Sequence, residues 1–344
     1  MYLDGKRVLV TGGTGSLGQR VVERLLAGDA GAVSRVIVMS RDEAKQHAMR
    51  LRFLGHTSAT DDVIFERTRQ RLQFRIGDVR DLSAMVECVR EADVIIHAAA
   101  LKQVPTCEFF PREAVLTNAL GADTIVRALQ VAGTHVEAVV GISTDKACKP
   151  VNVMGLTKAL MERLLIAANL AVPSTRFVCV RYGNVIGSRG SVVPLFVDQI
   201  ARGGPVTITT PDMTRFLVTL DQAVDAVFAV LADGKAGEIF VPRAGAARVV
   251  DVAEAMIGGR AVEIRYIGVR PGEKTHEILV SEEECARTSE RNGYYVVAPM
   301  LPELGGASAQ PPCLSVEYSS AHVTLSGAEL AEMIASSSSD HVAS

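Results

Sequence analysis

A glycine-rich turn close to the start of the chain limits the possible folds more than any other feature. An apolar run over residues 7–12 leads into Gly12, Gly15 and Gly18, and a helical pattern follows over residues 17–28. Spaced glycines let the backbone turn sharply and approach a pyrophosphate, whose charge is stabilised at a helix N-terminus. A plain tight turn does not need three spaced glycines. In this context the spacing predicts a dinucleotide-binding unit of strand, turn and helix.

Apolar strand patterns alternate with helical patterns through the first half of the chain. We expect helices at residues 17–28, 81–92 and 157–169, and strands at 7–12, 35–40, 72–78, 93–99, 137–144 and 177–184. Near-continuous apolar strands separated by helices indicate an α/β fold with a doubly wound parallel sheet of the Rossmann kind.

The pattern changes after about residue 185, where Gly and Pro become frequent and the helical stretches become shorter. We therefore expect a dinucleotide-binding domain over residues 1–184 and a smaller, mainly substrate-binding lobe over residues 185–335. Segments of this lobe are expected to return to the main sheet. A last helix begins at a capping box of Ser326 and Glu329, and the serine-rich tail over residues 336–344 is expected to be disordered.

Composition excludes several classes of function. Of the 344 residues 48% are hydrophobic and 22% charged, and the net charge is −3, so neither a nucleic acid nor an anionic membrane is expected as a partner. The six cysteines form no C-x-x-C pair, which indicates free thiols and a cytoplasmic location. The sequence has no apolar window long enough to span a membrane and no cluster with metal-ligand spacing.

The end of the second strand predicts which dinucleotide binds. Proteins that bind NAD place Asp or Glu there, whereas this chain has Ser40 and Arg41, with Lys45 close behind. An arginine can pair with a ribose 2′-phosphate, so NADP is favoured over NAD. The alternative is that Arg41 only caps its own helix neighbours, because Asp42 and Glu43 follow it.

The sequence MGLTK at residues 154–158 has the spacing of a Tyr-x-x-x-Lys pair, with Met154 in the place of the tyrosine and Lys158 retained. A thioether cannot act as a general acid or base. Either the chain has lost its chemistry, or the protons move through other groups. Asp145 and Lys146 follow the fifth strand and put a carboxyl beside an amine. The alternative for this pair is a surface ion pair.

Longer motifs carry a resemblance to a known family. They are TGGTGSLG, SRDEAKQ, GDVRD, HAAALKQVP, STDKACKPVNVMGLTKA, RYGNVIGSRGSVVPLF, TTPDMTRFL and VRPGEKTHE. Together they resemble the inverting UDP-N-acetylglucosamine 4,6-dehydratases (5-epimerases) of the extended short-chain dehydrogenase/reductase superfamily. The resemblance is closest to the capsule and O-antigen enzymes of UDP-N-acetyl-L-fucosamine synthesis. An insertion over residues 44–72 departs from the typical pattern, and so does Met154, although some capsule enzymes share this methionine.

The resemblance implies a reaction and a set of roles. Water is removed across C-5 and C-6 of the hexose after transient oxidation at C-4 with tightly bound NADP, which is regenerated in each turnover. Lys146 would remove the C-5 proton, Asp145 would protonate the departing C-6 hydroxyl, and Lys158 would bind the nicotinamide ribose. With Met154 in the place of the phenol, Lys146 is also expected to act as the C-4 base. A desolvated cleft favours the neutral amine and the protonated carboxyl, although mutual ion pairing opposes both.

The resemblance also implies UDP-N-acetylglucosamine as the substrate and a homo-oligomer, a hexamer, as the assembly. The remaining cofactor contacts are expected from Gly12, Thr14, Gly15, Ser16, Leu17, Gly18, Asp78, Val79, Ala98, Ala99, Ala100, Lys102, Asn118, Tyr182, Asn184 and Val185. The substrate contacts are expected from Lys102, Thr144, Asn184, Ser191, Val192, Thr207, Thr209, Arg215, Arg270 and Glu273. Arg270 and Glu273 could instead be a structural pair, and His97 is expected to be a core histidine.

Three other functions remain open. A UDP-sugar 4-epimerase needs the tyrosine as its C-4 acid and base, so Met154 counts against it. A retaining dehydratase would be expected to carry an Asp-Glu pair where this chain has Asp145 and Lys146. A non-catalytic NADP-binding regulator would not need to keep Asp145, Lys146 and Lys158 together.

Overall fold

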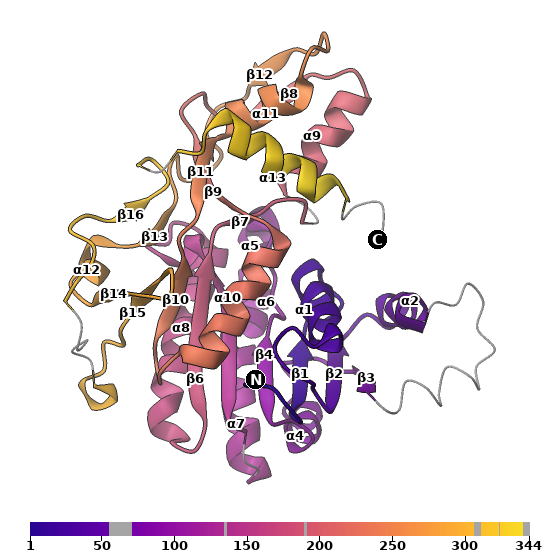
Figure 1. Cartoon of the computed structure of the whole chain (residues 1–344), viewed down its shortest axis with the longest axis vertical. Coiled ribbons are helices and arrows are strands. Elements are labelled where there is room, and N and C mark those ends of the chain that lie inside the picture. Colours follow the sequence, from indigo (N-terminus) through magenta and orange to yellow (C-terminus); the bar gives the residue numbers. More distant parts are fainter. Residues whose placement is uncertain (55–70, 134–135, 189–190, 306–310, 323, 340–344) are drawn as a thin grey trace.

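A nine-stranded sheet forms the centre of the structure, a computed structural model that describes residues 1–54, 71–133, 136–188, 191–305, 311–322 and 324–339 (Figure 1). The strand order is β14-β15-β10-β6-β5-β4-β1-β2-β3. The bounds are β1 (Arg7–Thr11), β2 (Arg35–Ser40), β3 (Leu72–Ile76), β4 (Val94–His97), β5 (Ala138–Thr144), β6 (Arg176–Tyr182), β10 (Ile239–Pro242), β14 (Thr288–Arg291) and β15 (Tyr294–Val297). The first seven of these run parallel, and β15 and β14 pair antiparallel at one edge. The predicted doubly wound α/β fold is confirmed.

Helices cover the sheet from both sides. On one side α4 (Leu82–Arg90) contacts α7 (Leu120–Ala132), which contacts α8 (Val153–Ala171), and α8 lies on β5 and β6. On the other side α1 (Ser16–Ala27) packs against α10 (Leu220–Asp233), which also contacts β5 and β6. Between β4 and α7 the chain forms α5 (Val104–Phe109), α6 (Pro111–Ala114) and a π-helical segment (Val115–Ala119).

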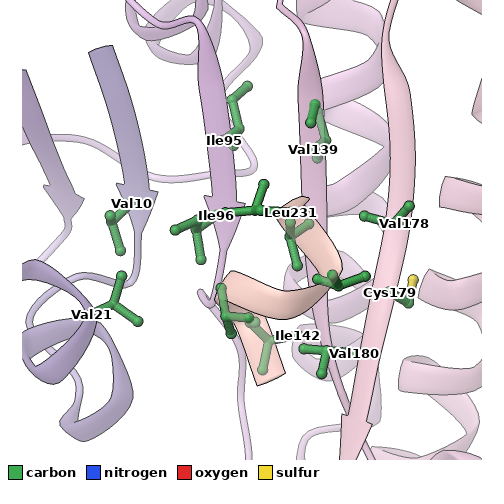
Figure 2. Packing of buried hydrophobic residues seen from close by; sticks show 14 of the residues in the cluster. Val10, Val21, Ile95, Ile96, Val139, Ile142, Val178, Cys179, Val180 and Leu231 are labelled. Carbon is green, nitrogen blue, oxygen red and sulfur yellow. The ribbon is translucent and has the colours of Figure 1, made fainter. Parts of the chain in front are cut away.

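The main hydrophobic core lies between the sheet and these helices. Figure 2 shows side chains of β4, β5 and β6 packing together, with Leu231 of α10 lying over them. Both faces of the central strands are covered, which explains why their sequences are continuous apolar runs and not alternating ones.

The later part of the chain builds a lobe with its own small core. Its sheets are β7 (Asn184–Val185), β9 (Thr214–Val218) and β11 (Gly245–Arg248); β8 (Val206–Ile208) with β12 (Ile264–Tyr266); and β13 (Ile278–Val280) with β16 (Tyr318–Ser319). Its helices are α9 (Val192–Ala201), α11 (Val249–Ile257), α12 (Glu282–Cys285) and α13 (Gly327–Ser339). Buried residues of α9, β8, β9 and α11 form a second hydrophobic cluster. The strands β10, β14 and β15, although they also follow residue 185, lie in the main sheet.

Several boundaries differ from those expected. Helix α8 begins at Val153 and not at residue 157, because the Asn152 side chain accepts a hydrogen bond from Gly155 N and caps the helix. Helix α13 continues to Ser339, four residues into the stretch expected to be disordered, and serine costs little in a helix. The insertion over residues 44–72 holds most of α2 (Glu43–Leu54) and the start of β3, and its residues 55–70 lie outside the described residues. Within the described chain, no helix has the length and apolar character that a membrane crossing needs.

Candidate active site

The glycine-rich turn connects β1 to α1 and faces the loop that follows β4. Gly12 has a φ of 67°, and a Cβ at this position would lie 2.7 Å from the Cα of Ala99. The backbone N of Gly15 donates to Gly12 O at 2.9 Å, and α1 begins at the next residue. The close backbones and the helix N-terminus together fit a pyrophosphate, which needs backbone access and a favourable helix dipole.

A cleft follows this turn along the carboxyl ends of the parallel strands, where ligands bind in open α/β sheets. Its lining residues are Gly12, Thr14, Gly15, Met39, Ser40, Arg41, Asp42, Lys45, Gly77, Asp78, Val79, Ala98, Ala99, Ala100 and Thr117. Most of the residues predicted for the cofactor are in this set. Of the other predicted residues, Ser16, Leu17 and Gly18 form the first turn of α1.

Thr117 is a cleft residue that the sequence did not indicate. It is buried in the π-helical segment, and its Oγ1 has no hydrogen-bond partner among the residues that the structure describes. A buried unpaired hydroxyl is costly, so this group is available to a ligand. A π-helical turn has no pattern of its own in the sequence, because its residues resemble those of an ordinary helix.

The segment after β2 places two cations at the outer end of the cleft. Arg41 has a side chain that is 55% exposed, and its Nη1 lies 3.7 Å from Asp78 Oδ2. Lys45 Nζ pairs with Asp42 Oδ2 at 2.6 Å, and the Asp42 carboxylate accepts a hydrogen bond from Lys45 N at 2.9 Å. Arg41 therefore pairs with the end of the neighbouring strand, and the capping of α2 falls to Asp42.

Asn118 ties the loop after β4 to α8. Its Oδ1 accepts from Leu101 N at 2.8 Å, and its Nδ2 donates to Leu101 O at 2.9 Å and to Thr157 Oγ1 at 3.0 Å. These bonds fix the backbone that carries the cleft residues Ala98–Ala100. Lys102, the residue after this anchor, is exposed.

Two carboxylates lie beside the amine of Lys146 just after β5. Asp145 is fully buried, and its Oδ1 accepts from Lys146 Nζ at 3.0 Å and from Thr144 Oγ1 at 2.8 Å. Glu277, which precedes β13, places its Oε1 3.2 Å from the same Nζ. The lysine side chain is 19% exposed, so the Asp145–Lys146 pair is not a solvated surface pair. Sequence reasoning missed Glu277, although it is the last residue of the quoted motif VRPGEKTHE.

The charges around Lys146 favour its protonated form. Burial alone would lower the pKa of Lys146, and the charge of Arg215 acts in the same direction. The carboxylates of Asp145 and Glu277 outweigh both, and the pKa of Lys146 is raised. The expectation that a desolvated cleft would favour the neutral amine is therefore wrong for this arrangement of charges, because ion pairing prevails.

Met154 is a packing residue close to these groups. Its side chain is buried in a small apolar cluster with Cys107 and Ala114, which lie on α5 and α6. The next residue, Gly155, lies against the backbone carbonyl of Lys146, and a Cβ there would clash with it. Glycine in MGLTK thus lets α8 begin directly beside the Asp145–Lys146 turn.

Lys158 lies one turn further along α8, inside the protein. Its Nζ donates to Ile142 O at 2.7 Å and lies 3.4 Å from Met161 Sδ. Burial lowers the pKa of Lys158 to about 8, against opposing contributions from Cys179 and Glu162. The neutral form of Lys158 is thus accessible close to neutral pH, in contrast to that of Lys146.

His97 ends β4 below the cleft and is completely buried. Its Nδ1 forms a 2.8 Å hydrogen bond with Thr11 Oγ1. Burial, assisted by the charge of Lys158, lowers the pKa of His97 to about 3, so the ring is neutral. These are the properties of the expected core histidine.

Of the predicted substrate residues, Arg215 lies close to this site. Arg215 on β9 is buried, and its Nε lies 3.8 Å from Glu277 Oε1. Asn184 and Ser191 have buried side-chain oxygens that find no hydrogen-bond partner within the described ranges. Val192, also predicted for the substrate, begins α9. Of the residues predicted for the cofactor, Tyr182 is buried at the end of β6 and Val185 pairs with Val218 of β9.

Others are engaged within the later lobe. Thr207 Oγ1 accepts from Gln199 Nε2 at 2.8 Å, and Thr209 Oγ1 donates to Glu273 Oε2 at 3.4 Å. Arg270 is exposed and contributes its carbonyl oxygen to a turn with Glu273 N. In the described part of the chain the two side chains form no ion pair with each other, so the structure does not contain the alternative structural pair.

The family of the chain follows from a comparison with known proteins. Residues 8–299 match the family model described as "Polysaccharide biosynthesis protein". The chain belongs to this family.

Similar proteins include a named epimerase and a named dehydratase. A protein from Rickettsia akari named UDP-glucose 4-epimerase is 44% identical over 300 residues, which are 86% of this chain and 83% of the relative. The structure of Pen from Bacillus thuringiensis is 31% identical, with a TM-score of 0.85, and the match covers 98% of this chain and 99% of Pen. DesIV, a dTDP-glucose 4,6-dehydratase from Streptomyces venezuelae with NAD bound, is 24% identical with a TM-score of 0.66, covering 78% of this chain and 86% of DesIV.

These likenesses confirm the extended short-chain dehydrogenase/reductase fold. The proteins that are similar to this family member thus include both a named epimerase and a named dehydratase.

Proposed function

We propose that this protein is a carbon–oxygen lyase that catalyses the inverting 4,6-dehydration of UDP-N-acetylglucosamine with epimerisation at C-5. The product is UDP-2-acetamido-2,6-dideoxy-β-L-arabino-hex-4-ulose, formed in the cytoplasm for a surface polysaccharide such as a capsule. One observation carries the proposal. A buried carboxyl and an amine, Asp145 and Lys146, meet at 3.0 Å just after β5, while a packed methionine occupies the place of the catalytic phenol.

NADP is the proposed cofactor. Arg41 and Lys45 lie where a ribose 2′-phosphate would be held, and the glycine-rich turn and Thr117 would hold the rest of the dinucleotide. When bound, NADP would accept a hydride from C-4 of the sugar and later donate it to C-6. The structures of three neighbouring proteins contain NAD, so the discrimination between NAD and NADP rests on Arg41.

The Asp145–Lys146 pair contains the protons that the elimination needs. An ammonium beside a carboxylate and an amine beside a carboxylic acid differ only in the position of one proton, which has to pass from Lys146 Nζ to Asp145 Oδ1 along a hydrogen bond of 3.0 Å. In the second form Lys146 takes the C-5 proton as the C–H bond breaks. Asp145 gives its proton to the C-6 oxygen as the C–O bond breaks, and water leaves. The pair is then an ammonium and a carboxylate again.

The C-4 hydroxyl needs a proton acceptor other than Met154. Lys158 is the candidate, because it is the retained lysine of the Tyr-x-x-x-Lys spacing, one turn along α8 from Met154, and burial lowers its pKa to about 8. Our proposal therefore assigns the C-4 proton to Lys158 and the C-5 proton to Lys146.

A UDP-sugar 4-epimerase is the second candidate, because relatives that are 44% identical carry that name. Such an enzyme oxidises and reduces the same carbon and needs no acid for a leaving hydroxyl. An epimerase would not need the buried Asp145–Lys146 pair. It would need a catalytic tyrosine, and this chain has Met154 at that position. A non-catalytic NADP-binding regulator would leave both lysines without a task.

Incubation with UDP-N-acetylglucosamine in deuterated water distinguishes the three functions. The proposal predicts deuterium at C-5 and a 4-keto-6-deoxy product by NMR spectroscopy, with loss of both in Lys146→Ala. A sugar epimerised at C-4 without deuterium at C-5 would establish the epimerase. An unchanged sugar, together with NADP binding in calorimetry, would support the regulator. UDP-glucose serves as the comparison substrate.

A further inference from the structure

Glu277 is buried beside the proposed proton-transfer site, although it comes from the last third of the chain. Its side chain is 2% exposed, and its Oε1 lies 3.2 Å from Lys146 Nζ. Its backbone is fixed on both sides, because Glu277 N donates to Ser320 Oγ at 2.9 Å and Glu277 O accepts from Ser320 N at 2.8 Å. The carboxylate is therefore held in place by the β13–β16 pair.

Other cations lie further from Glu277 than Lys146 does. Arg215 Nε is 3.8 Å from Oε1, and Lys274 Nζ is 3.8 Å from Oε2. Both have nearer partners, since Arg215 Nη1 donates to Thr214 O at 2.7 Å and Lys274 Nζ donates to Cys148 O at 2.6 Å. Glu277 Oε2 has no hydrogen-bond partner among the described residues. The shortest contact of this carboxylate to a cation is thus with Lys146.

The contact between Glu277 and Lys146 Nζ affects how the amine is oriented. A lysine nitrogen has four tetrahedral directions, one of which is its own Cε. Asp145 Oδ1 accepts a hydrogen bond in one of the others at 3.0 Å, and Glu277 Oε1 lies 3.2 Å from the nitrogen as an ion-pair partner. After a proton has passed from Lys146 Nζ to Asp145, the neutral amine keeps two N–H bonds, and one of them can point at Glu277 Oε1, which restricts the direction of the lone pair.

We propose that Glu277 is a positioning residue for Lys146, which holds one N–H of the amine so that its lone pair faces the C-5 hydrogen of the substrate. This inference rests on the proposed function, because it deepens the role of Lys146 in the dehydration. It makes the site a triad of Asp145, Lys146 and Glu277, assembled from both halves of the chain.

Glu277 also affects the proton of Lys146. The charged groups around the amine are Asp145, Glu277 and Arg215, and the two carboxylates together raise the pKa of Lys146 against burial and Arg215. Removing the charge of Glu277 should therefore lower this pKa, while removing the acceptor should disorient the amine. The two effects can be separated by two substitutions.

The first measurement needs no sugar. Holoenzyme is labelled with acetic anhydride across a pH series, and acetylation of Lys146 is quantified by peptide mass spectrometry. In Glu277→Gln the pH at half-maximal labelling should fall relative to wild type. The matched control is Glu317→Gln, which removes the carboxylate that pairs with Lys149 at the surface. In this variant the pH at half-maximal labelling of Lys146 should not change. An unchanged midpoint in Glu277→Gln would refute the coupling between Glu277 and Lys146.

The second measurement follows C-5 deuterium incorporation from UDP-N-acetylglucosamine. Glu277→Gln keeps an acceptor and should retain kcat within about tenfold, whereas Glu277→Ala should lose about 100-fold in kcat with little change in KM. Glu277→Asp keeps the charge but places the carboxylate further from Lys146 Nζ, so its kcat should also fall. This variant tests the proposal even if Glu277→Ala does not fold. Rates of Glu277→Ala and Glu277→Asp close to wild type would overturn the proposal. If wild type itself gives no C-5 deuterium, the proposed function fails, and the labelling result still decides the Glu277–Lys146 coupling.

Discussion

Met154 occupies the position at which the sequence pattern leads one to expect a phenol, and its surroundings are those of a packing residue. Its contacts with Cys107 and Ala114 are apolar, and a thioether has no proton to transfer. We therefore expect Met154→Leu, a nearly volume-conserving change, to cost less than about 1.5 kcal/mol of stability. The dehydration rate should stay within about threefold of wild type, measured as release of the 4-keto product. A loss of rate without a loss of stability would show that the sulfur takes part in the reaction.

Lys158 should make the stability of the protein depend on pH in the alkaline range. Its pKa falls from an ordinary 10.5 to about 8 on folding, so between these values the unfolded chain binds a proton that the folded protein has lost. Stability from this group therefore rises with pH across that window, by up to about 3 kcal/mol. Below about pH 8 the cost of burying the charge is present in full.

Urea unfolding of wild type and Lys158→Met, without added cofactor, measures this effect. Wild type should gain stability relative to the variant between pH 8 and pH 10. A difference in unfolding free energy that stays flat over this range would contradict the lowered pKa. Lys149→Met should show no such trend between pH 8 and pH 10, because the hydrogen bond to Glu317 raises the pKa of Lys149 above 10.5 and its contribution changes only at higher pH.

At the scale of single residues, the sequence predicted those parts of the site that follow from local pattern. The glycine-rich turn and the Asp145–Lys146 pair stand at strand ends, and strand ends can be predicted from apolar runs. Glu277 could not be predicted in this way, because its contact with Lys146 joins positions 131 residues apart. Nor could the charge state of Lys146, because it depends on that distant carboxylate.

Among the elements, a buried charge cluster joins β6, α8 and α12. Arg181 forms a forked pair with Glu162, through Nε at 3.0 Å and Nη2 at 2.7 Å, and its Nη1 bonds Glu284 at 2.8 Å. Ser143 of β5 also donates to Glu162. The cluster therefore fixes α8, which carries Met154 and Lys158, against β5, which ends one residue before Asp145.

We expect Arg181→Met to destabilise the protein by about 3–5 kcal/mol, because it leaves the buried Glu162 without its cation and leaves Glu284 only its longer contact with Arg287, at 3.5 Å. Burial alone would raise the pKa of Glu284, but Arg181 outweighs burial and lowers it from 4.5 to about 2. The stabilisation that this shift provides is complete above pH 4.5 and is lost as the pH falls toward 2. In urea unfolding, the difference in unfolding free energy between wild type and Arg181→Met should thus become smaller as the pH falls from 7 to 3.

A surface arginine provides the control for this prediction. Arg202 pairs with Asp198 while its side chain is 76% exposed, so Arg202→Met should cost less than about 1 kcal/mol. Equal costs for Arg181→Met and Arg202→Met would show that the buried cluster does not stabilise α8.

Elements with a strong period were predictable, and those formed by a few capping contacts were not. The strand β2 was predicted at its observed bounds, residues 35–40, because its apolar run ends where the sheet ends. Helix α8 was expected to begin later, because its first turn depends on the Asn152 cap and on the contact of Gly155 with Lys146. The short α5, α6 and π-helical segments have too few residues for a periodic signal.

For the whole molecule, the two halves of the sequence are not independent units. Strand β10 pairs with β6, and β15 and β14 extend the same sheet, so strands from beyond residue 185 complete the domain that the first half begins. The same later residues provide Glu277 and Glu284 to the two buried charge clusters. Sequence patterns indicated that segments would return to the sheet, but the choice of neighbours depends on packing between distant segments.

Cofactor binding should stabilise this combined structure as a unit. A ligand that binds only the folded state adds about 2.7 kcal/mol to the unfolding free energy at 100 times its Kd. We expect NADP to raise the Tm more than NAD does at equal concentration, because Arg41 is mostly exposed at the cleft and its contact with Asp78 is long, at 3.7 Å, so that its side chain can turn toward a 2′-phosphate. Arg41→Ala should weaken NADP binding by about tenfold and leave NAD binding nearly unchanged, since one charge-assisted hydrogen bond is lost. Arg52→Ala, which removes a cation of the same helix region that pairs with Glu23, is the control.

A larger Tm increase with NAD than with NADP in wild type would reverse the cofactor assignment. An equal loss of binding for both cofactors in Arg41→Ala would show that Arg41 does not distinguish them.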